Sequence, residues 1–405
     1  MTAALQGVVV LDLSRILAGP WSTQSLADLG AEVIKVERPG AGDDTRSWGP
    51  PFATDGEGAA GDAAYFFCCN RGKRSLTLDF TVEQGRAVLL ELVKKADILV
   101  ENYKVGGLKK YGLDYETLSQ VNPRLIYCSI TGFGQTGPYA TRPGYDALIQ
   151  AMGGLMSITG EPDEVPGGGP QKVGVAVVDI LTGLYATTAI LAALHHRGHS
   201  GKGQHIDVAL LDVQVAALAN QASNYLIAGK VPGRLGSAHP SIVPYQPFPC
   251  ADGHVMLAIG NDTQFANFCQ AASCAELASD PRFATNAERV HNRAQLIPLL
   301  QERILAKTID QWCELATRHG FPCGPINTID RVFEDEHIRA RQLRVEVDSP
   351  RYGKVGLVAS PMRFSETPIR YDSPPPELGQ DTEAVLAELG VDTARIAELK
   401  ALKAI

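Results

Sequence analysis

The chain lacks the short motifs that identify many enzymes. No G-x-G-x-x-G follows its first apolar segment and no P-loop occurs in its 405 residues, so neither a nicotinamide cofactor nor ATP is supported. It also contains no H-E-x-x-H and no C-x-x-C, and its eight cysteines are scattered along the chain. We therefore expect no metal site, no permanently bound cofactor and no disulfides.

Positive charge and long apolar runs are scarce as well. The net charge of −8 argues against a protein that binds nucleic acid. No uninterrupted apolar run approaches the roughly 20 residues that cross a bilayer, so we expect no association with a membrane. The first residues, Met1–Gln6, lack the charged region of a signal peptide, which predicts a cytoplasmic protein.

The length of the chain and the order of its apolar segments predict an α/β protein with more than one domain. At 405 residues, the chain is too long for one simple core. The apolar run Gly7–Leu13 is typical of a buried parallel strand, Trp21–Leu29 of a helix and Ala31–Glu37 of a second strand. This order predicts a doubly wound, Rossmann-like sheet.

Composition changes at Gly229–Gln246, which is rich in Gly, Pro and Ser and suggests a domain boundary. We therefore predict a large α/β domain over residues 1–228, a small α+β domain over 229–330 and a C-terminal segment over 331–405. Within the large domain, further strands are expected over Arg74–Asp79, Asp97–Asn102 and Arg124–Ile130. Helices are expected over Val82–Ala96, Gly144–Met152 and, as one element, Val208–Ala228.

Ligands of doubly wound sheets bind at the carboxyl ends of the strands, which places Arg15–Ala18 and Arg38–Arg46 at the functional edge. Basic residues near the strand ends suit a ligand that carries phosphate. Solvated surface charges are the commoner fate of such residues, so both interpretations stay open. The residues are Arg38, Arg46, Arg71, Lys73 and Arg74.

A long helix is expected from Lys172 to Arg197, because apolar residues recur at helical spacing, and Asp179 lies near its start. The common role of an Asp there is to cap the helix by accepting backbone N–H bonds. The alternative role is that of a nucleophile, because a helix N-terminus favours an ionised carboxylate, which can attack an activated acyl group. Spacing alone leaves both roles open.

Taken in order, many stretches of the chain resemble the class III CoA-transferases, the family of formyl-CoA and carnitine CoA-transferases. They are Val8–Leu13, Leu17–Pro20, Leu29–Gly40, Thr45–Arg46, Lys73–Ser75, Val100–Asn102, Gly132–Pro138, Gly174–Gly183, Lys202–Gln204 and Leu378–Gln380. Each stretch is short, but the ordered set covers nearly the whole chain. Within the family, Arg38–Arg46, Tyr127–Gly132 and Ser241–Gln246 are most similar to the branch that uses succinyl-CoA with glutarate or hydroxymethylglutarate.

The resemblance implies that Asp179 is the catalytic nucleophile, which forms a mixed anhydride with the acyl group and then an aspartyl-CoA thioester. It implies that a CoA thioester is a co-substrate, that residues 331–405 return to the large domain, and that two chains interlock as a homodimer. Lys110 stands where formyl-CoA transferase has Arg, and Arg142 is the expected substitute for a Lys that Pro143 replaces. The CoA-binding positions implied are Leu17, Ala18, Arg38, Leu78, Asp79, Asn102, Tyr103, Lys110, Arg142 and Tyr145.

The expected reaction is transfer of CoA from succinyl-CoA to a dicarboxylic acid such as glutarate or hydroxymethylglutarate. The distal carboxylate of the acid needs a cation. Arg15, Arg46 and Arg142 are candidates, each equally explained as a contact to a CoA phosphate or as a surface charge. His239 is a further substrate candidate or a structural loop residue.

Two alternatives remain. A 2-methylacyl-CoA racemase shares the fold, but Tyr145 occupies the place of the racemase His. An unperturbed tyrosine, with a pKa of about 10, is poorly suited to abstract a proton at neutral pH. A non-catalytic CoA-binding protein would retain the basic residues and would not need Asp179.

Overall fold

The computed structural model describes residues 3–405, which divide into two compact units. The larger unit contains the residues up to Gly154, Val173–Ala222 and Glu336–Ile405, and the smaller contains Leu155–Lys172 and Ser223–Asp335. The sequence analysis had placed 155–172 in the large domain. The structure places this segment in the smaller unit, where the Gly236 N–H donates to the Gly160 carbonyl at 3.0 Å and the Arg234 side chain donates to the Glu161 carbonyl at 3.0 Å.

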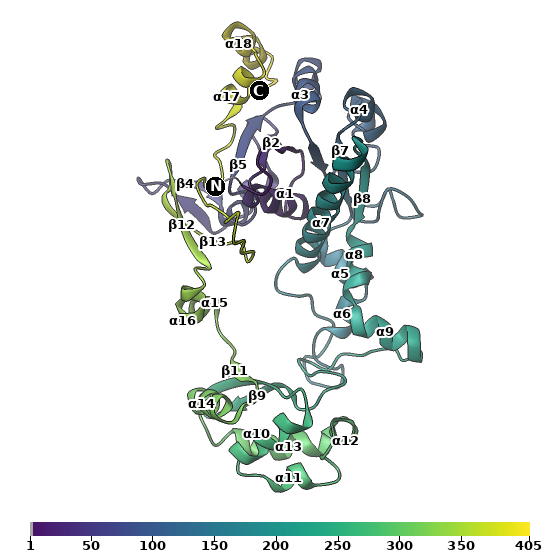
Figure 1. The fold of residues 1–405 in the computed structure, drawn as a ribbon, viewed down its shortest axis with the longest axis vertical. Coiled ribbons are helices and arrows are strands. Elements are labelled where there is room, and N and C mark those ends of the chain that lie inside the picture. The colour runs from purple at the N-terminus through teal and green to yellow at the C-terminus, as the bar shows by residue number, and fades with distance from the viewer. Residues whose placement is uncertain (1–2) are drawn as a thin grey trace. The chain divides into compact units, whose positions relative to one another are not determined.

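A six-stranded parallel sheet is the centre of the larger unit (Figure 1). Its strands lie in the order β5-β2-β1-β6-β7-β8. This confirms the parallel α/β sheet expected from sequence, and the order reverses between β1 and β6, where doubly wound folds bind their ligands. The strands are β1 Val9–Asp12, β2 Glu32–Glu37, β5 Lys73–Thr77, β6 Ile98–Glu101, β7 Ile126–Thr131 and β8 His205–Ala209.

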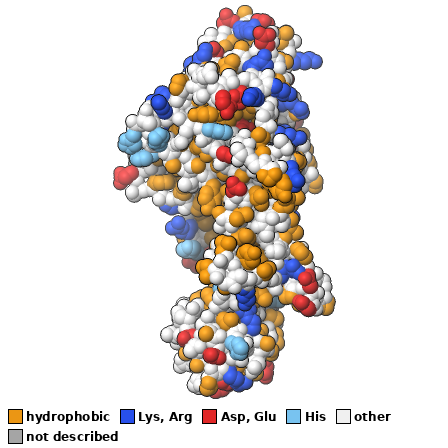
Figure 2. Space-filling view, turned by 90° about the vertical axis from the view of Figure 1, so that its right-hand side faces the viewer, with side chains coloured by type: hydrophobic (Ala, Val, Ile, Leu, Met, Phe, Trp, Pro, Cys, Tyr) orange, Lys and Arg blue, Asp and Glu red, His pale blue; other side chains and the backbone are white. Residues whose placement is uncertain are grey.

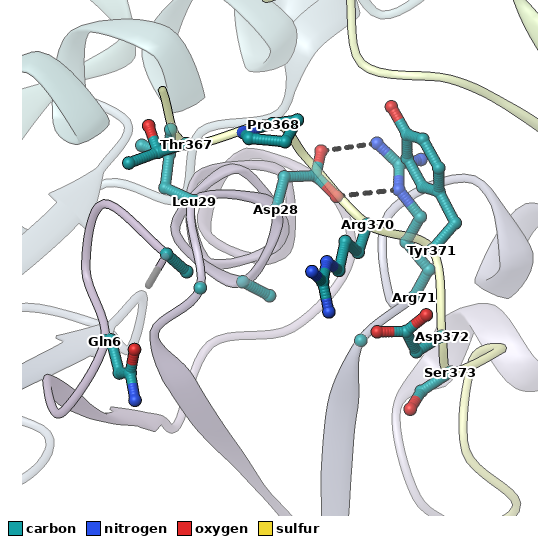
Figure 3. A pocket seen from close by; sticks show the side chains of 14 residues that line it. Gln6, Asp28, Leu29, Arg71, Thr367, Pro368, Arg370, Tyr371, Asp372 and Ser373 are labelled. Atoms are coloured by element: carbon teal, nitrogen blue, oxygen red, sulfur yellow. Dashed lines mark hydrogen bonds and ion pairs between the residues drawn. The ribbon is translucent and has the colours of Figure 1, made fainter. Parts of the chain in front are cut away.

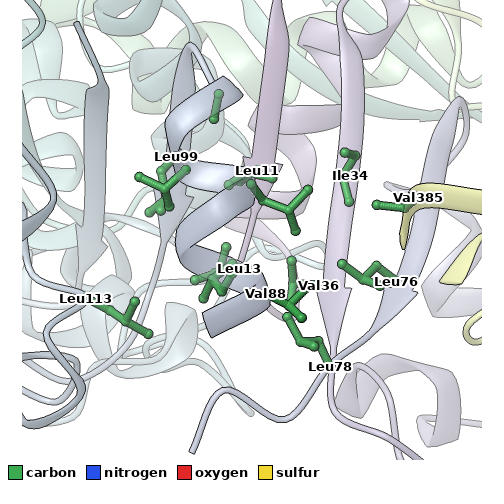
Figure 4. Packing of buried hydrophobic residues seen from close by; sticks show 14 of the residues in the cluster. Leu11, Leu13, Ile34, Val36, Leu76, Leu78, Val88, Leu99, Leu113 and Val385 are labelled. Carbon is green, nitrogen blue, oxygen red and sulfur yellow. The ribbon is translucent and has the colours of Figure 1, made fainter. Parts of the chain in front are cut away.

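Helices cover both faces of this sheet because its buried strands are apolar on both sides. On one face, Leu11, Ile34 and Leu99 pack with α3, α4 and the C-terminal helices α17 and α18 (Figure 4). On the other face, Val10 and Val33 pack with α1, α5, α7 and α8. The bounds are α1 Ala18–Asp28, α3 Glu83–Lys95, α4 Tyr115–Val121, α5 Asp146–Met152, α7 Val177–Ser200, α8 Leu210–Ala217, α17 Thr382–Glu388 and α18 Thr393–Ala401.

The expected single helix over Val208–Ala228 is wrong. Residues His205–Ala209 form β8, the sixth strand of the sheet, and two helices follow, α8 and α9 (Ala219–Ala228). The helices are separate because Ala219, where α9 begins, has a positive φ of 45°, which interrupts the right-handed helical conformation. Apolar residues in an unbroken run do not distinguish a buried strand from a helix, which explains the error.

The helix that carries Asp179 is α7. Gly183, one turn after Asp179, lets α7 approach α1 closely, because a Cβ there would lie 2.7 Å from the Ala18 carbonyl oxygen. Contrary to the sequence analysis, α7 is long and apolar enough to cross a membrane by length and composition, with a mean hydropathy of 1.8. A helix in the core of a protein meets the same criterion, and α7 packs against α1, α8, β7 and β8.

Small elements complete the larger unit. Strands β12 and β13 form an antiparallel hairpin in the C-terminal part of the chain, and short strands and helices follow β2. These elements are η1 Asp44–Ser47, β3 Phe52–Thr54, β4 Ala60–Ala63, α2 Ala64–Phe67, η2 Lys109–Tyr111, α16 Glu336–Ala340, β12 Arg344–Ser349 and β13 Gly353–Val358.

The smaller unit has a three-stranded antiparallel sheet in the order β11-β10-β9 and its own apolar core around Phe248, Phe268 and Trp312. Its strands are β9 Tyr245–Cys250, β10 Gly253–Ala258 and β11 Cys323–Pro325. Its helices are α6 Leu155–Ile158, α10 Asp262–Ala271, α11 Glu276–Ser279, α12 Asn286–His291, α13 Arg293–Ile304, α14 Ile309–His319 and α15 Ile329–Glu334.

Candidate active site

The point where the strand order reverses carries the first elements of the site. The chain leaves β1 as Ser14–Leu17 and leaves β6 at Asn102, and the two segments are joined by hydrogen bonds. The Arg15 N–H donates to Asn102 Oδ1 at 2.9 Å, and Asn102 Nδ2 donates to the Arg15 carbonyl at 2.7 Å. Asn102 therefore holds the backbone that follows β1.

A cavity of about 430 Å³ opens above this point, and we call it the transfer pocket. It brings together with Asp179 six of the ten expected CoA-contacting residues and the substrate candidate Arg15. These residues are Arg15, Leu17, Ala18, Asn102, Tyr103, Arg142 and Tyr145, and Ile130, Thr131 and Gly132 also line the cavity.

A second cavity of about 340 Å³ shares Arg15, Tyr103 and Gly107 with the transfer pocket, and we call it the neighbouring pocket. The remaining expected CoA-contacting residues line it, namely Arg38, Leu78, Asp79 and Lys110. Arg38 and Lys110 are both exposed there, so their positive charges are available to a phosphate-bearing ligand. The two pockets together could take an elongated ligand with an acyl end near Asp179 and a charged end near Arg38.

Two backbone segments approach each other closely in the wall of the transfer pocket, at Gly132 and Gly144. A Cβ on Gly132 would lie 2.6 Å from the Gly144 Cα, and a Cβ on Gly144 would lie 2.5 Å from the Gly132 Cα. The loop after β7 and the loop before α5 can therefore touch only because both residues are glycine. Both glycines line the pocket beside Tyr145.

Asp179 is not the cap of α7, which begins at Val177. The cap is Asp146 of α5, whose Oδ2 accepts the N–H groups of Val178 at 2.8 Å and Asp179 at 3.3 Å. Asp146 is in turn held by Gln150, whose Nε2 donates to Oδ1 at 2.5 Å. With the capping role taken by another residue, the Asp179 side chain has no hydrogen-bond or ion-pair partner among residues 3–405.

The expected ionised state of Asp179 needs correction. Burial raises the pKa of Asp179 to about 7, and the negative charge of Asp146 adds to the rise. Near pH 7 the group is thus present in both forms, and its ionised form is a poorly solvated and reactive carboxylate.

Most of the basic residues noted in the sequence are structural. Arg46 is buried and binds Glu37 at 2.7 Å and Asp62 at 2.8 Å, so the structure excludes it as a free cation for substrate. Lys73 is buried against Asp12 at 3.0 Å. Arg74 pairs with Glu32 and Glu388.

Arg71 is also structural, because it binds Asp28 through two hydrogen bonds of 2.8 and 2.5 Å (Figure 3). This pair lies beside a separate cavity of about 280 Å³ that contains none of the expected site residues. Tyr371 lies near the Arg71 guanidinium, 5.5 Å from it, and completes the packing. Of the five strand-end cations, only Arg38 lines a pocket with other expected site residues.

The remaining substrate candidates differ in setting. Arg15 pairs with the exposed Asp44 at 2.8 Å, whereas the Arg142 guanidinium stacks over the Tyr139 ring at 3.8 Å. His239 belongs to the smaller unit, where its Nδ1 accepts the Ser241 N–H at 3.0 Å, as a structural loop residue does. No group of three His, Cys, Asp or Glu side chains that could hold a metal ion occurs within residues 3–405.

No role was expected from sequence for Asp146, Asp43 or Ile16, although Asp43 lies within the stretch Arg38–Arg46 that resembles the family. Asp146 lies at the start of the predicted helix over Gly144–Met152, where an Asp commonly caps its own helix. In the structure it caps a different helix, α7. Asp43 and Ile16 meet through a hydrogen bond between segments far apart in sequence, which no local pattern records.

Comparison with known proteins identifies the family. The model of CoA-transferase family III matches residues 5–382. This chain belongs to CoA-transferase family III.

Its relatives in this family are similar along nearly their whole length. It is 51% identical over 385 residues to a succinate–glutarate CoA-transferase of Agrobacterium fabrum, covering 95% of each chain. It is 45% identical over 396 residues to the human succinyl-CoA:glutarate CoA-transferase, covering 98% of this chain and 88% of that protein. The crystal structure of a CAIB/BAIF family protein from Brucella suis has a TM-score of 0.85 and 53% identity, covering 96% of this chain and 100% of that one.

Proposed function

We propose that this family III CoA-transferase moves CoA from succinyl-CoA to glutarate. The similarity to succinate–glutarate CoA-transferases over almost the whole chain carries this proposal. The transfer pocket supports it, because it places an unpartnered carboxylate beside the residues expected to hold CoA.

The proposed nucleophile is Asp179. Its carboxylate attacks the succinyl thioester carbonyl, the C–S bond breaks, and CoA leaves as a thiolate from a succinyl–aspartyl anhydride. The thiolate then attacks the aspartyl carbonyl, which releases succinate and leaves an aspartyl-CoA thioester. Each step exchanges a carboxylate for a thiolate or the reverse, so no ATP is consumed.

Glutarate completes the cycle. One of its carboxylates attacks the aspartyl thioester, releasing CoA thiolate and forming a glutaryl–aspartyl anhydride. The thiolate attacks the glutaryl carbonyl, which yields glutaryl-CoA and regenerates the Asp179 carboxylate. Arg15 and Arg142 are the cations of the transfer pocket that could meet the distal carboxylate of the acid or a CoA phosphate.

The proposal is tested by mixing the purified protein with succinyl-CoA and separate dicarboxylic acids, without ATP or metal, and identifying acyl-CoA products by mass spectrometry. We expect glutaryl-CoA and free succinate in equal amounts. The panel includes hydroxymethylglutarate, citramalate and itaconate, with formate and carnitine as monocarboxylate comparisons. Faster reaction with a monocarboxylate would contradict the proposed acceptor, and proton exchange into a 2-methylacyl-CoA without transfer would indicate a racemase.

The role of Asp179 is tested with glutarate that carries heavy oxygen in its carboxylates. Cleavage of the glutaryl–aspartyl anhydride leaves one acceptor oxygen on the aspartate, so the peptide with Asp179 gains one heavy oxygen. Asp179→Asn should lose on the order of 10⁴-fold in turnover and still bind CoA. Asp348→Asn, which changes an exposed carboxylate of β12, is the matched control and should keep full activity. An unlabelled Asp179 in an active enzyme would remove it from this role.

We also propose that the protein is a homodimer in the cytoplasm. Large apolar side chains are exposed on α7, α8 and α9, and Figure 2 shows a broad area of such side chains on the face that it draws. The exposed residues include Leu184, Tyr185 and Val215 in the larger unit and Leu226 and Ile227 in the smaller unit, and exposed apolar side chains in such number favour association. All eight cysteines are unpaired, which supports a reducing compartment. Light scattering of the purified protein tests the dimer, and a monomer at micromolar concentration would contradict it.

A further inference from the structure

Ile16, in the wall of the transfer pocket, has a backbone conformation that isoleucine rarely adopts. Its φ is 73°, in the left-handed region, where a β-branched residue is strained. Such a conformation persists only where the surroundings impose it. Glycine would adopt the same φ without this strain, so the presence of isoleucine means that other groups hold the turn.

Side chains from distant segments hold the backbone of Ser14–Ile16. The Ile16 N–H donates to both carboxylate oxygens of Asp43, each at 3.2 Å. Lys35 Nζ donates to the Ser14 carbonyl at 2.9 Å, and Asn102 binds both backbone groups of Arg15. The segment after β1 is thus fixed at three successive residues.

The Asp43 carboxylate is itself fixed in place and ionised. It binds Lys35 Nζ at 2.8 Å, with both side chains almost fully buried, and its Oδ1 accepts the Thr45 N–H at 3.0 Å and the Thr45 hydroxyl at 2.8 Å. Although burial opposes ionisation, Lys35 lowers the pKa of Asp43 below its ordinary value. The bond from Ile16 is therefore charge-assisted and ends on an acceptor that cannot move.

The turn at Ile16 decides how the next two residues face the transfer pocket. Leu17 and Ala18 line it together with Asp179, and as whole residues they are only 5% and 4% exposed. Their place in the wall is set by the course of the backbone that follows Ile16. Rotation of φ at Ile16 into the ordinary negative range would redirect that backbone.

We propose that Asp43 is a positioning residue for CoA transfer, which acts by holding Ile16 in its left-handed conformation and so keeps the Leu17–Ala18 wall facing Asp179. This inference rests on the proposed function, and it adds a residue that lies outside the transfer pocket. Asp43 is among the residues around the neighbouring pocket, but its side chain has no exposed surface and is bonded to protein groups, so it contacts neither CoA nor the proposed nucleophile. Its effect should therefore be on turnover more than on the binding of CoA.

The test compares Asp43→Asn, Ile16→Gly and the double variant in the transfer assay. The carboxamide keeps the shape of the side chain and loses its charge, so we expect Asp43→Asn to lower kcat by about 100-fold, with the KM for succinyl-CoA changed by less than about threefold. Ile16→Gly alone supplies the turnover against which the double variant is compared, because Ile16 itself lines the transfer pocket. Because glycine needs no help to hold a positive φ, the double variant should regain at least about tenfold of the lost turnover.

Thr45→Val is the matched control, because it removes a hydroxyl donor to Asp43 and leaves the Ile16 bond intact. It should have near-normal kcat. Normal turnover in Asp43→Asn, or a double variant no more active than Asp43→Asn, would overturn the proposal, since a merely structural ion pair with Lys35 would not be rescued at Ile16.

Two further measurements keep the test decisive. If Asp43→Asn does not fold, Ile16→Pro replaces it, because proline has no N–H for Asp43 and cannot adopt a positive φ. Ile16→Val keeps the N–H group and is the control. Normal turnover in a folded Ile16→Pro protein would overturn the proposal.

Hydrogen exchange of residues 14–18 separates this inference from the proposed function. Asp43→Asn or Ile16→Pro should raise exchange there, and no change would refute the positioning role even if the wild-type protein transferred no CoA.

Discussion

Buried carboxylates of the larger unit occupy two contrasting regions. Under the strand ends, Asp12 and Asp43 lie within a network of cations and donors, and although burial alone would raise the pKa of Asp12, Lys73 and Lys35 lower it to about 2. In the transfer pocket, Asp179 forms no ion pair with any residue of 3–405, and burial together with the charge of Asp146 raises its pKa to about 7. The removal of water is common to both regions, so the sign of the neighbouring charges decides the outcome.

The contrast has a functional meaning. A paired carboxylate is stable and inert, and the cation network serves to hold backbone, as Lys35 does at Ser14 and Asp43 does at Ile16. An unpaired buried carboxylate destabilises the fold when it ionises, and such groups are retained mainly where their reactivity is used. The molecule therefore places a reactive group beside a rigid network that holds the surrounding pocket wall.

The largest effect on the free energy of unfolding should come from removing a cation from the network around Asp12 and Asp43. Lys73→Met leaves Asp12 buried without its closest cation, at 3.0 Å in the wild type, and we expect a loss of about 3–5 kcal/mol in the free energy of unfolding. Urea unfolding measures it. The double variant Asp12→Asn, Lys73→Met removes both charges and should recover part of the loss. If the single variant were as stable as the wild type, the network would not stabilise the fold as described.

Removal of the Asp179 carboxylate should, in contrast, stabilise the folded protein, and this stabilisation should appear only as the pH rises. The pKa of Asp179 is raised from 3.8 to about 7, so the folded protein retains a proton that the unfolded chain releases. The resulting penalty is absent below about pH 4, grows as pH rises toward 7, and is complete above 7. Asp179→Asn removes it, and should stabilise the protein by up to about 4 kcal/mol at pH 8, less whatever solvent screening removes.

Urea unfolding of Asp179→Asn and the wild type at pH 4 and pH 8 tests this dependence. The two proteins should have similar stability at pH 4 and differ at pH 8. Asp348→Asn, at an exposed site, should match the wild type at both values. A destabilised Asp179→Asn at pH 8 would mean that the carboxylate has a partner that compensates its burial.

Much of the first half of the fold was predictable because its strands are short apolar runs separated by clear turns. The strand at Glu32–Glu37 and the helix at Glu83–Lys95 illustrate this, since each was expected within a few residues of its bounds. The strand β8 was missed because His205–Ala209 leads directly into an apolar helix, and periodicity does not separate the two.

The site was predictable in its members and not in its electrostatics. Sequence resemblance selected Asp179, Tyr103 and Arg38, and the structure places them in the two joined pockets. The sequence could not show that Arg46 is held by Glu37, or that Asp146 rather than Asp179 caps α7. Both facts depend on contacts between distant segments of the chain. The pKa of Asp179 follows from burial, which is a property of the folded chain.

The smallest expected effect separates the two causes of the raised pKa at Asp179. Burial is the larger cause and the charge of Asp146 the smaller, so Asp146→Asn should lower the pKa of Asp179 but leave it above the ordinary value of 3.8. Asn keeps a carbonyl oxygen for the N–H groups of Val178 and Asp179, so the start of α7 should remain capped. Gln150 must reverse its amide to meet the new side chain, and this reversal gives up the bond that its Oε1 accepts from the Val173 N–H at 2.9 Å.

A pH profile of kcat/KM for glutaryl-CoA formation measures the change, because its acidic limb reports the ionisation of the essential base in the free enzyme. For the wild type, activity should fall as pH drops below about 7, since protonation of Asp179 removes the attacking carboxylate. In Asp146→Asn the limb should move to lower pH, while Asp348→Asn leaves it in place. An unmoved limb would assign the raised pKa to burial alone, and a limb moved to higher pH would mean that Asp146 helps Asp179 to ionise by holding the helix start against it.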